Sequence, residues 1–336
     1  MTILYIGNNL SRNSKYHSAF SSLKNNLRSE KHKVITASSQ KNQLLRLLDI
    51  VWTVLLHAKK VDYILIDTFS TSAFYFAFIS SQLARLFQTK YIPILHGGNL
   101  PSRLENSPKM SKMIFNNSFV NVAPSGYLLN AFEKKGYNTY VIPNTIDIQI
   151  YPFKERNLIE PKLLYVRAFA QIYNPNMALE VLKLVQEKYP KATLCMVGPD
   201  RDGTLQAFRK QMIKMNLEEH IKITGVLPKE EWHQLSKEYD VFINTTNIDN
   251  TPVSLLEAMA LGLPIVSTNV GGIPYLVEED KEGVLVAPND AFAMASGIVK
   301  LLENSENTNR LSKIGRTKVE QMDWQVVKKE WAKILA

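Results

Sequence analysis

A chain of 336 residues exceeds the usual length of one domain, so about two domains are expected. Apolar residues make up 45% of it, which is ordinary for globular proteins and is enough for two hydrophobic cores. No apolar run reaches the roughly 18 residues that would span a bilayer.

The formal net charge of +9 is unevenly distributed along the chain. Residues 1–155 contain 18 basic and 8 acidic side chains, whereas the remainder contains 22 and 23. This imbalance predicts an anionic partner for the first half: a membrane surface, a lipid phosphate or an acidic glycan. We do not expect nucleic acid, because the chain has no zinc-finger spacing, no aromatic RNA-binding signature and no Arg-rich recognition helix.

The cysteine content and the N-terminus bear on the cellular compartment. Cys195 is the single cysteine, so an intramolecular disulfide is excluded, and its apolar surroundings favour a core position. The chain begins with a strand-like run and no cleavable signal pattern. We therefore expect a cytoplasmic protein, with the inner face of the membrane as the other location considered.

Short apolar runs alternate with helical patterns throughout the chain, which is typical of parallel sheets with helices on both faces. The runs form two series, which predicts two doubly wound α/β domains. Polar residues, Pro152 and Pro161 break the periodicity at 147–162, between the two series. The expected strands are 2–7, 33–38, 63–67, 91–96, 119–125, 139–144, 162–167, 192–198, 221–225, 241–245, 264–268 and 283–288.

Two stretches of the first half combine apolar and basic residues. Residues 43–60 are apolar over a wide arc with basic ends, and we favour a helix buried against the sheet over one that contacts a membrane. Residues 109–119 mix Met, Ile and Phe with lysines, and for them both readings stay open.

The most informative segment is 249–276, which follows a buried strand at 240–246. A helix is predicted from Val253 to Leu261, started by Pro252 and stopped by Gly262. In an open α/β sheet, ligands bind beyond the carboxyl ends of the strands, where a helix N-terminus attracts an anion. This pattern predicts a diphosphate at the helix start, with the Glu257 carboxylate accepting hydrogen bonds from a ribose and Asp249 facing the same crevice.

The segment resembles the motif of the retaining glycosyltransferases of the GT4 family, in which an acidic residue precedes a Glu by eight positions. Earlier in the chain, Pro143, Asn144 and Asp147 are similar to the family's pattern at the end of its first domain. The matching residues of the motif are Asp249, Glu257, Ala258, Met259, Ala260, Gly262, Pro264, Gly271 and Gly272.

The resemblance implies the GT-B fold, with two doubly wound Rossmann-like domains facing a central cleft. Residues 1–155 plus 320–336 would form the acceptor-binding domain, because the family's last helix crosses back to the first domain. Residues 156–319 would form the nucleotide-sugar-binding domain.

The resemblance also assigns roles to residues of the second half. Arg167 would hold the donor diphosphate, and Asp249 would bind sugar hydroxyls and steady developing positive charge. The family's Lys a few residues after this Arg is absent, and Arg201 is the candidate substitute. Asp249 is one methylene shorter than the family's usual Glu. Other expected donor-binding residues are Asn250, Thr251, Val253, Ser254, Glu257 and the base-binding turn of Gly225, Val226 and Leu227.

In the first half, His96 would lie near the scissile bond and act as a catalytic residue, because it follows a strand and begins the run HGGN. Glycines that allow close backbone approach mark the expected acceptor site. That site would comprise Gly7, Asn8, Asn9, Gly97, Gly98 and Arg103.

The resulting hypothesis is a retaining hexosyltransferase that uses a nucleotide-sugar donor and a glycan or lipid-linked hydroxyl acceptor, in surface polysaccharide or glycolipid synthesis. The resemblance implies transfer without a metal or other cofactor. Two alternatives stay open: a GT-B nucleotide-sugar epimerase and a non-catalytic nucleotide-sugar-binding protein. A Rossmann dehydrogenase is disfavoured because no strand precedes a G-x-G-x-x-G run.

Overall fold

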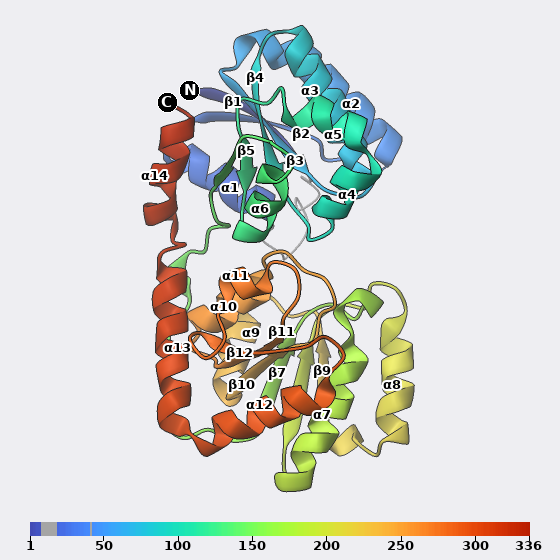
Figure 1. Ribbon diagram of the computed structural model, residues 1–336, viewed down its shortest axis with the longest axis vertical. Helices are drawn as coiled ribbons and strands as arrows, with labels where there is room; N and C mark the ends of the chain where they lie inside the picture. The colour runs from blue at the N-terminus through green and yellow to red at the C-terminus, as the bar shows by residue number, and fades with distance from the viewer. Residues whose placement is uncertain (8–18, 41) are drawn as a thin grey trace. The chain divides into compact units, whose positions relative to one another are not determined.

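The computed structural model describes residues 1–7, 19–40 and 42–336. The chain divides into two compact units, each an α/β domain with helices on both faces of a parallel sheet (Figure 1). Unit 1 comprises Met1–Thr145 and Trp324–Ala336, and unit 2 comprises Ile146–Asp323. Each of the strands expected from the sequence is present, so the predicted class of two doubly wound domains is confirmed.

The sheet of unit 1 has the strand order β2-β1-β3-β4-β5-β6, and its strands are parallel. The chain moves from β1 to β2 on one side and then crosses to β3 on the other, which places a topological switch point between β1 and β3. The elements are β1 (Thr2–Ile6), α1 (Ala19–Ser29), β2 (Lys33–Ala37), α2 (Gln43–His57), β3 (Tyr63–Thr68), α3 (Ala73–Leu86), β4 (Lys90–Leu95), α4 (Leu100–Asn106), α5 (Pro108–Phe115), β5 (Asn121–Ala123), α6 (Gly126–Glu133), β6 (Thr139–Val141) and α14 (Trp324–Ile334).

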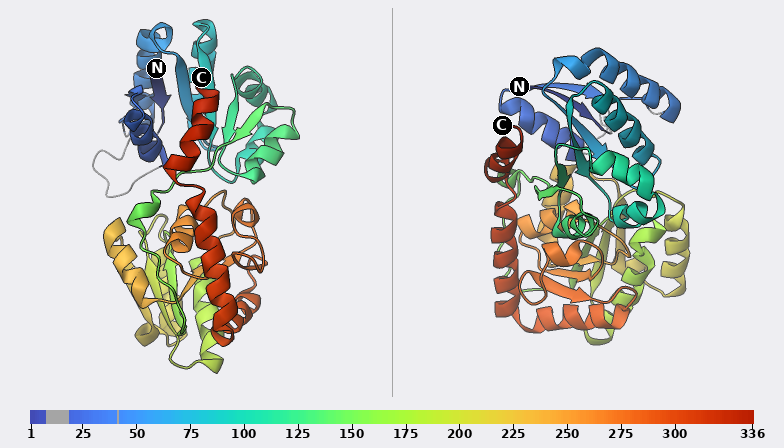
Figure 2. Two further views of the ribbon diagram at one scale, coloured as in Figure 1. Left: turned by 90° about the vertical axis from the view of Figure 1, so that its left-hand side faces the viewer. Right: turned by 45° about the horizontal axis from the view of Figure 1, so that its top comes forward.

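Alternate residues of the unit 1 strands enter separate cores on the two faces of the sheet. Ile3 and Tyr5 of β1 pack in one core with residues of α1 and α14. Leu4 and Ile6 pack in the other core with residues of α2 and α3. The C-terminal helix α14, red in Figure 2, thus belongs to unit 1, as the sequence predicts.

Helix α2 corrects one prediction, because the apolar arc of 43–60 is largely exposed rather than buried. Ile50 and Val54 pack on the sheet, but the large side chains on the other side of the helix are 45–67% exposed. The arc is wider than the strip that the sheet and α3 cover. The exposed residues are Leu44, Leu45, Leu48, Trp52, Leu55 and Leu56.

The second apolar and basic stretch, 109–119, is partly buried. It contributes most of α5, whose Ile114 and Phe115 lie in a core of unit 1, whereas Met113 is 40% exposed. Packing in this core and against α3 therefore accounts for Ile114 and Phe115, whereas Phe119 is, like Met113, exposed.

The sheet of unit 2 has the order β12-β11-β10-β7-β8-β9, again with parallel strands. Its switch point lies between β7 and β10, since the chain runs from β7 outward to β9 and then crosses to β10. The elements are β7 (Lys162–Val166), α7 (Pro175–Lys188), β8 (Thr193–Val197), α8 (Thr204–Lys214), β9 (Ile221–Gly225), α9 (Lys229–Leu235), β10 (Val241–Asn244), α10 (Val253–Ala260), β11 (Ile265–Thr268), α11 (Ile273–Leu276), β12 (Gly283–Val286), α12 (Ala291–Glu303) and α13 (Ser305–Glu320).

The units divide after Thr145 rather than after residue 155, where the sequence placed the boundary. Tyr151 is 2% exposed and belongs to the core of unit 2 that also contains residues of α10 and Cys195. The return to unit 1 falls at Trp324 rather than at residue 320, because α13 packs on α10 and Met322 packs on the same core. Packing, rather than composition, thus sets both boundaries.

Arg156 anchors the start of unit 2. Its side chain is 2% exposed and donates hydrogen bonds to the carbonyl oxygens of Tyr239, Ser236 and Gly262, at 3.1, 3.1 and 2.7 Å. Its Nε lies 3.5 Å from the buried Asp240 carboxylate. Burial lowers the pKa of Arg156 to about 10, so the group stays charged at neutral pH.

We expect Arg156→Ala to lower the free energy of unfolding of unit 2 by about 3–5 kcal/mol, because buried carbonyls and the Asp240 carboxylate lose their donor. Urea unfolding followed by tryptophan fluorescence measures the change, and the buried Trp232 is the tryptophan that reports on unit 2. As control, Lys313→Ala removes an exposed ion pair with Glu155 and should change the value by about 0.5 kcal/mol or less. Equal stabilities of the two variants would contradict the anchoring role of Arg156.

Candidate functional site

Arg167 and Asp249 meet at the switch point of unit 2. Arg167 directly follows β7, Asp249 lies in the loop after the neighbouring β10, and Nη2 of Arg167 forms an ion pair with Oδ2 of Asp249. The guanidinium carbon also lies 4.2 Å from the ring centroid of Tyr173. Two residues that the sequence assigns to the donor therefore lie together, and in the structure they neutralise each other.

Three glycines hold the backbone around this ion pair. A Cβ on Gly271 would lie 2.0 Å from the Asp249 carbonyl oxygen, and one on Gly272 would lie 1.9 Å from that of Asn250. The Gly272 N–H also donates to the Asp249 carbonyl oxygen at 3.0 Å. On the other side, a Cβ on Gly198 would lie 2.1 Å from the Arg167 carbonyl oxygen. Only glycine permits these approaches, so the loops that carry Arg167 and Asp249 are fixed by backbone packing.

Helix α10 begins in this region with polar groups that lack partners. The side-chain oxygens of Thr251 and Ser254 are buried and accept or donate no hydrogen bond within the described part of the chain. Pro252 at the cap position supplies no side-chain hydrogen bond to the first turn. The helix start therefore offers backbone N–H groups and hydroxyls to a ligand. Of the other predicted residues here, Asn250 is buried and Val253 is 44% exposed.

Glu257, one turn into α10, has two partners that sequence reasoning missed. Its Oε1 accepts a hydrogen bond from the Tyr151 hydroxyl at 2.8 Å and lies 2.8 Å from Nζ of Lys229. Nζ of Lys229 lies 5.2 Å from the Tyr151 ring centroid. Burial, reinforced by the Glu257 charge, raises the pKa of Tyr151, so its hydroxyl stays protonated and donates. Lys229 comes just after the expected base-binding turn, and this position in the sequence could have indicated that it lies at the site.

A neutral histidine, His233, lies beside Tyr151, the hydrogen-bond donor to Glu257. The His233 ring lies 4.5 Å from the Tyr151 ring, centroid to centroid. Burial, together with the charge of Lys229, lowers the pKa of His233 to about 4. His233 therefore carries no charge at neutral pH, and Lys229 is the cation that contacts Glu257.

The expected base-binding turn and Arg201 lie at the same edge of the sheet. Gly225 ends β9 with φ of 69°, and its carbonyl oxygen accepts a hydrogen bond from the Gly198 N–H at 2.8 Å. Val226 is 43% exposed and Leu227 packs on a core of unit 2. Arg201 is exposed, and its backbone N–H donates to the Phe169 carbonyl oxygen, two residues after Arg167; the ion pair of Asp249 is with Arg167.

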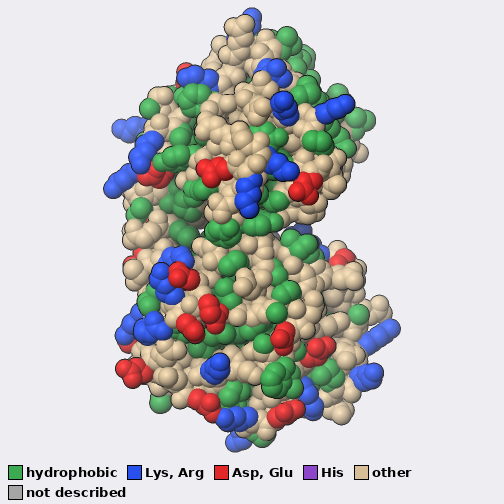
Figure 3. Space-filling view, in the orientation of Figure 1, with side chains coloured by type: hydrophobic (Ala, Val, Ile, Leu, Met, Phe, Trp, Pro, Cys, Tyr) green, Lys and Arg blue, Asp and Glu red, His purple; other side chains and the backbone are tan. Residues whose placement is uncertain are grey.

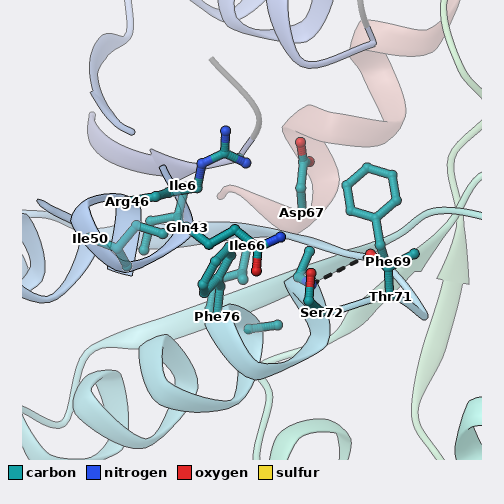
Figure 4. Close-up of a pocket in the computed structure, with 13 residues that line it drawn as sticks. Ile6, Gln43, Arg46, Ile50, Ile66, Asp67, Phe69, Thr71, Ser72 and Phe76 are labelled. Carbon is teal, nitrogen blue, oxygen red and sulfur yellow. Dashed lines mark hydrogen bonds between the residues drawn. The ribbon is translucent and has the colours of Figure 1, made fainter. Parts of the chain in front are cut away.

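Unit 1 has a pocket of about 220 Å³ at its own switch point, lined by Gly7, Asp67, Phe69 and residues of α2 and α3. Figure 4 shows the side chains of Arg46 and Asp67 pointing the same way from α2 and β3. A Cβ on Gly7 would lie 2.4 Å from Oδ2 of Asp67, so the first strand can approach this carboxylate only with glycine at its end.

Asp67 organises the predicted catalytic residue His96. Oδ1 of Asp67 accepts a hydrogen bond from the Tyr5 hydroxyl at 2.8 Å and lies 2.9 Å from Nε2 of His96. The ring of Phe69 stacks on that of His96 with centroids 4.9 Å apart. Burial raises the pKa of Tyr5, with a further contribution from the Asp67 charge. The sequence reasoning missed Asp67, although its place at the end of a predicted strand was a usable signal.

The other residues expected at the acceptor site are distributed differently. Gly97 has φ of 87° with open space around its Cβ position, and the Gly98 carbonyl oxygen accepts a hydrogen bond from the Tyr127 hydroxyl. Arg103 lies over the rings of Phe74 and Tyr75, at 4.6 and 5.2 Å from their centroids, and does not line the pocket. Asn8 and Asn9 lie outside the described residues.

Residues 1–7, 19–40 and 42–336 contain no helix with the length and apolarity to cross a membrane. They also contain no group of three or more His, Cys, Asp or Glu side chains placed to hold a metal ion. The expectation of metal-independent chemistry stays a prediction.

Curated relatives match parts of the chain. Sulfoquinovosyl transferase SQD2 of Arabidopsis thaliana is 31% identical over 151 residues, which are 44% of this chain and 28% of that protein. Amylovoran biosynthesis glycosyltransferase AmsK of Erwinia amylovora is 25% identical over 266 residues, 75% of this chain and 65% of that protein. The matches thus span less than two thirds of either relative.

A fold comparison and a family model give two further matches. Anabaena HepE, solved in complex with UDP, matches 100% of this chain and 99% of its own with a TM-score of 0.77 and 17% sequence identity, which shows a shared GT-B fold. Residues 147–318 match the model of the family described as glycosyl transferases group 1. This match covers most of unit 2, including Arg167, Asp249 and Glu257, and more than half of the chain. The chain therefore belongs to the group 1 glycosyl transferases.

Proposed function

We propose that the protein transfers a sugar from a nucleotide-diphosphate donor to a hydroxyl acceptor, with retention of anomeric configuration, in the synthesis of a surface polysaccharide or glycolipid. The observation that carries this proposal is the start of α10, where buried hydroxyls without partners lie in the chain between Asp249 and Glu257. A polar site of this kind at a switch point suits an anionic ligand. The names of the two relatives, a sulfoquinovosyl transferase and a glycosyltransferase, support it.

In the proposed complex, the donor diphosphate lies at the first turn of α10. Backbone N–H groups and the hydroxyls of Thr251 and Ser254 would donate to its oxygens. Arg167, held by its stacking on Tyr173, would add a cation beside the leaving group, which replaces the charge that a divalent metal supplies elsewhere. Asp249 would then turn its carboxylate from Arg167 to hydroxyls of the transferred sugar.

The nucleoside would extend toward Glu257 and the turn after β9. Glu257 would accept hydrogen bonds from the ribose hydroxyls. Tyr151 and Lys229 hold this carboxylate in place, because one donates a hydrogen bond and the other contributes a positive charge. We propose that Lys229 thereby positions the donor, a task distinct from that of the lysine missing after Arg167.

The acceptor hydroxyl would bind in unit 1. Asp67 fixes the His96 ring through Nε2, and the adjoining pocket combines the Arg46 cation with apolar walls. Such a pocket suits an acceptor that joins a polar or anionic group to an apolar one. Glycans and lipid-linked sugars are the classes considered.

Nucleotide binding tests the donor site directly. We expect one of UDP, GDP or ADP, or its sugar conjugate, to raise the melting temperature selectively and equally with and without EDTA. Glu257→Gln should weaken that nucleotide about 10- to 100-fold, because charge-assisted hydrogen bonds to the ribose are lost.

Glu303→Gln, which removes an exposed carboxylate of the same unit, is the matched control and should bind as the unmodified protein does. Stabilisation that depends on a metal would refute the metal-free site. Binding without any sugar transfer to glycan or lipid-linked acceptors would favour a nucleotide-sugar-binding protein instead.

The glycine loop gives a second test. Gly272→Ala should weaken the same nucleotide at least about tenfold, because a Cβ 1.9 Å from the Asn250 carbonyl oxygen must displace the loop that leads into α10. The control is Gly315→Ala in α13, where the added Cβ would make only ordinary contacts, at 3.5 Å or more. Isothermal titration calorimetry of both variants, after circular dichroism has verified folding, measures the affinity for the nucleotide. Unchanged affinity in Gly272→Ala would place the diphosphate elsewhere.

A further inference from the structure

Helix α2 presents an uninterrupted apolar surface, which we call the α2 face. It consists of Leu44, Leu45, Leu48, Trp52, Leu55 and Leu56. At 100° per residue these six side chains fall within about a third of the helix circumference. No charged residue of α2 lies within that arc, and Asp49 lies at its edge. Isolated exposed apolar residues are normal, but a continuous surface of this kind marks an interaction site.

The rest of the helix is already engaged. Ile50 and Val54 pack in the core of unit 1, and α3 packs alongside. In the space-filling view, hydrophobic side chains gather at the upper right of unit 1, where α2 lies, with basic side chains beside them (Figure 3). The α2 face is therefore additional to the surface that the fold requires.

Charge indicates what covers this face. Unit 1 contains 20 Lys and Arg against 7 Asp and Glu, a net charge of +13, whereas unit 2 contains 20 against 24 and is net negative. Lys59 and Lys60 are exposed directly after the C-terminal end of α2. A helix with large apolar side chains, a tryptophan and flanking lysines has the composition of one that lies in the interface of an anionic bilayer.

The same helix also reaches the pocket of unit 1. Gln43, Arg46 and Ile50 line that pocket from the side of α2 opposite the exposed leucines. A bilayer that contacts the α2 face would thus lie one helix diameter, about 10 Å, from the pocket. This distance suits an acceptor whose lipid stays in the membrane while its polar head reaches Arg46.

We propose that the α2 face docks on an anionic lipid bilayer and presents the unit 1 pocket to lipid-linked acceptors. The docking itself is independent of the donor site. Only the link to lipid-linked acceptors depends on the proposed glycosyl transfer. Vesicle binding is measured without donor and nucleotide binding without vesicles, so failure of one proposal is distinguishable from failure of the other.

Trp52 provides a direct signal. It is 63% exposed, whereas Trp232, Trp324 and Trp331 are 4–7% exposed. Vesicles of phosphatidylglycerol and phosphatidylcholine should shift the tryptophan emission to shorter wavelength, and Trp52→Phe should abolish that shift. Vesicles of phosphatidylcholine alone, or high salt, should reduce binding several-fold because the attraction between lysines and lipid is lost or screened.

Sedimentation with vesicles measures the contribution of the leucines. The double variant Leu48→Ser and Leu55→Ser should bind at least about tenfold more weakly, because two apolar side chains no longer leave water. Phe292→Ser in α12 of unit 2 replaces a 72% exposed aromatic residue and should bind normally. All variants should keep the melting temperature of the unmodified protein, since the replaced side chains are exposed.

Three results would overturn the proposal. The first is no emission shift and no sedimentation of the unmodified protein with anionic vesicles. The second is equal binding by the double variant and the Phe292 control. The third is an emission shift that appears without vesicles as protein concentration rises, which would show that a second copy of the chain covers the α2 face.

Discussion

The proposed donor site depends on a close contact between two loops, in which two glycines of one loop pack against the backbone of the other. Gly271 and Gly272 lie so close to the carbonyl oxygens of Asp249 and Asn250 that any Cβ would overlap them. This contact connects the loop after β11 to the loop after β10 and fixes the direction in which α10 begins. Asp249, the hydroxyls of Thr251 and Ser254, and Glu257 one turn later all take their positions from it. Close backbone packing of this kind preorganises the two loops, and preorganisation lowers the entropic cost of binding.

The strands and the doubly wound class were predictable because the apolar, β-branched runs are short and each precedes a helical pattern. The same logic located Arg167 and Asp249, since both follow buried strands. Their mutual ion pair was not predictable, because it depends on β7 and β10 being neighbours across the switch point, which sequence order does not reveal. The contacts of Glu257 with Tyr151 and Lys229 were missed because they join segments that are far apart in the sequence.

Exposure was the least predictable property. The periodicity of α2 is that of a helix with a wide apolar arc, and this pattern is the same whether a sheet or another surface covers it. Only the packing of Ile50 and Val54 shows which part of the arc faces the core. The unit boundary was wrong for a similar reason, since Tyr151 and Arg156 lie in a polar, proline-containing stretch and yet are each only 2% exposed.

The switch point of unit 2 combines groups that attract an anion with a carboxylate that opposes one. In unit 2 the crevice has a helix start and Arg167, which suit an anion, but Asp249 offsets the arginine charge. An isolated arginine there would attract any phosphate. An arginine paired with Asp249 instead favours a ligand that also donates hydrogen bonds to the carboxylate. A nucleotide sugar meets both demands, since its diphosphate suits Arg167 and its sugar hydroxyls suit Asp249. In the proposed function this pairing thus favours the intact donor over the free nucleotide and inorganic phosphate, because only the donor provides a partner for each half of the broken ion pair.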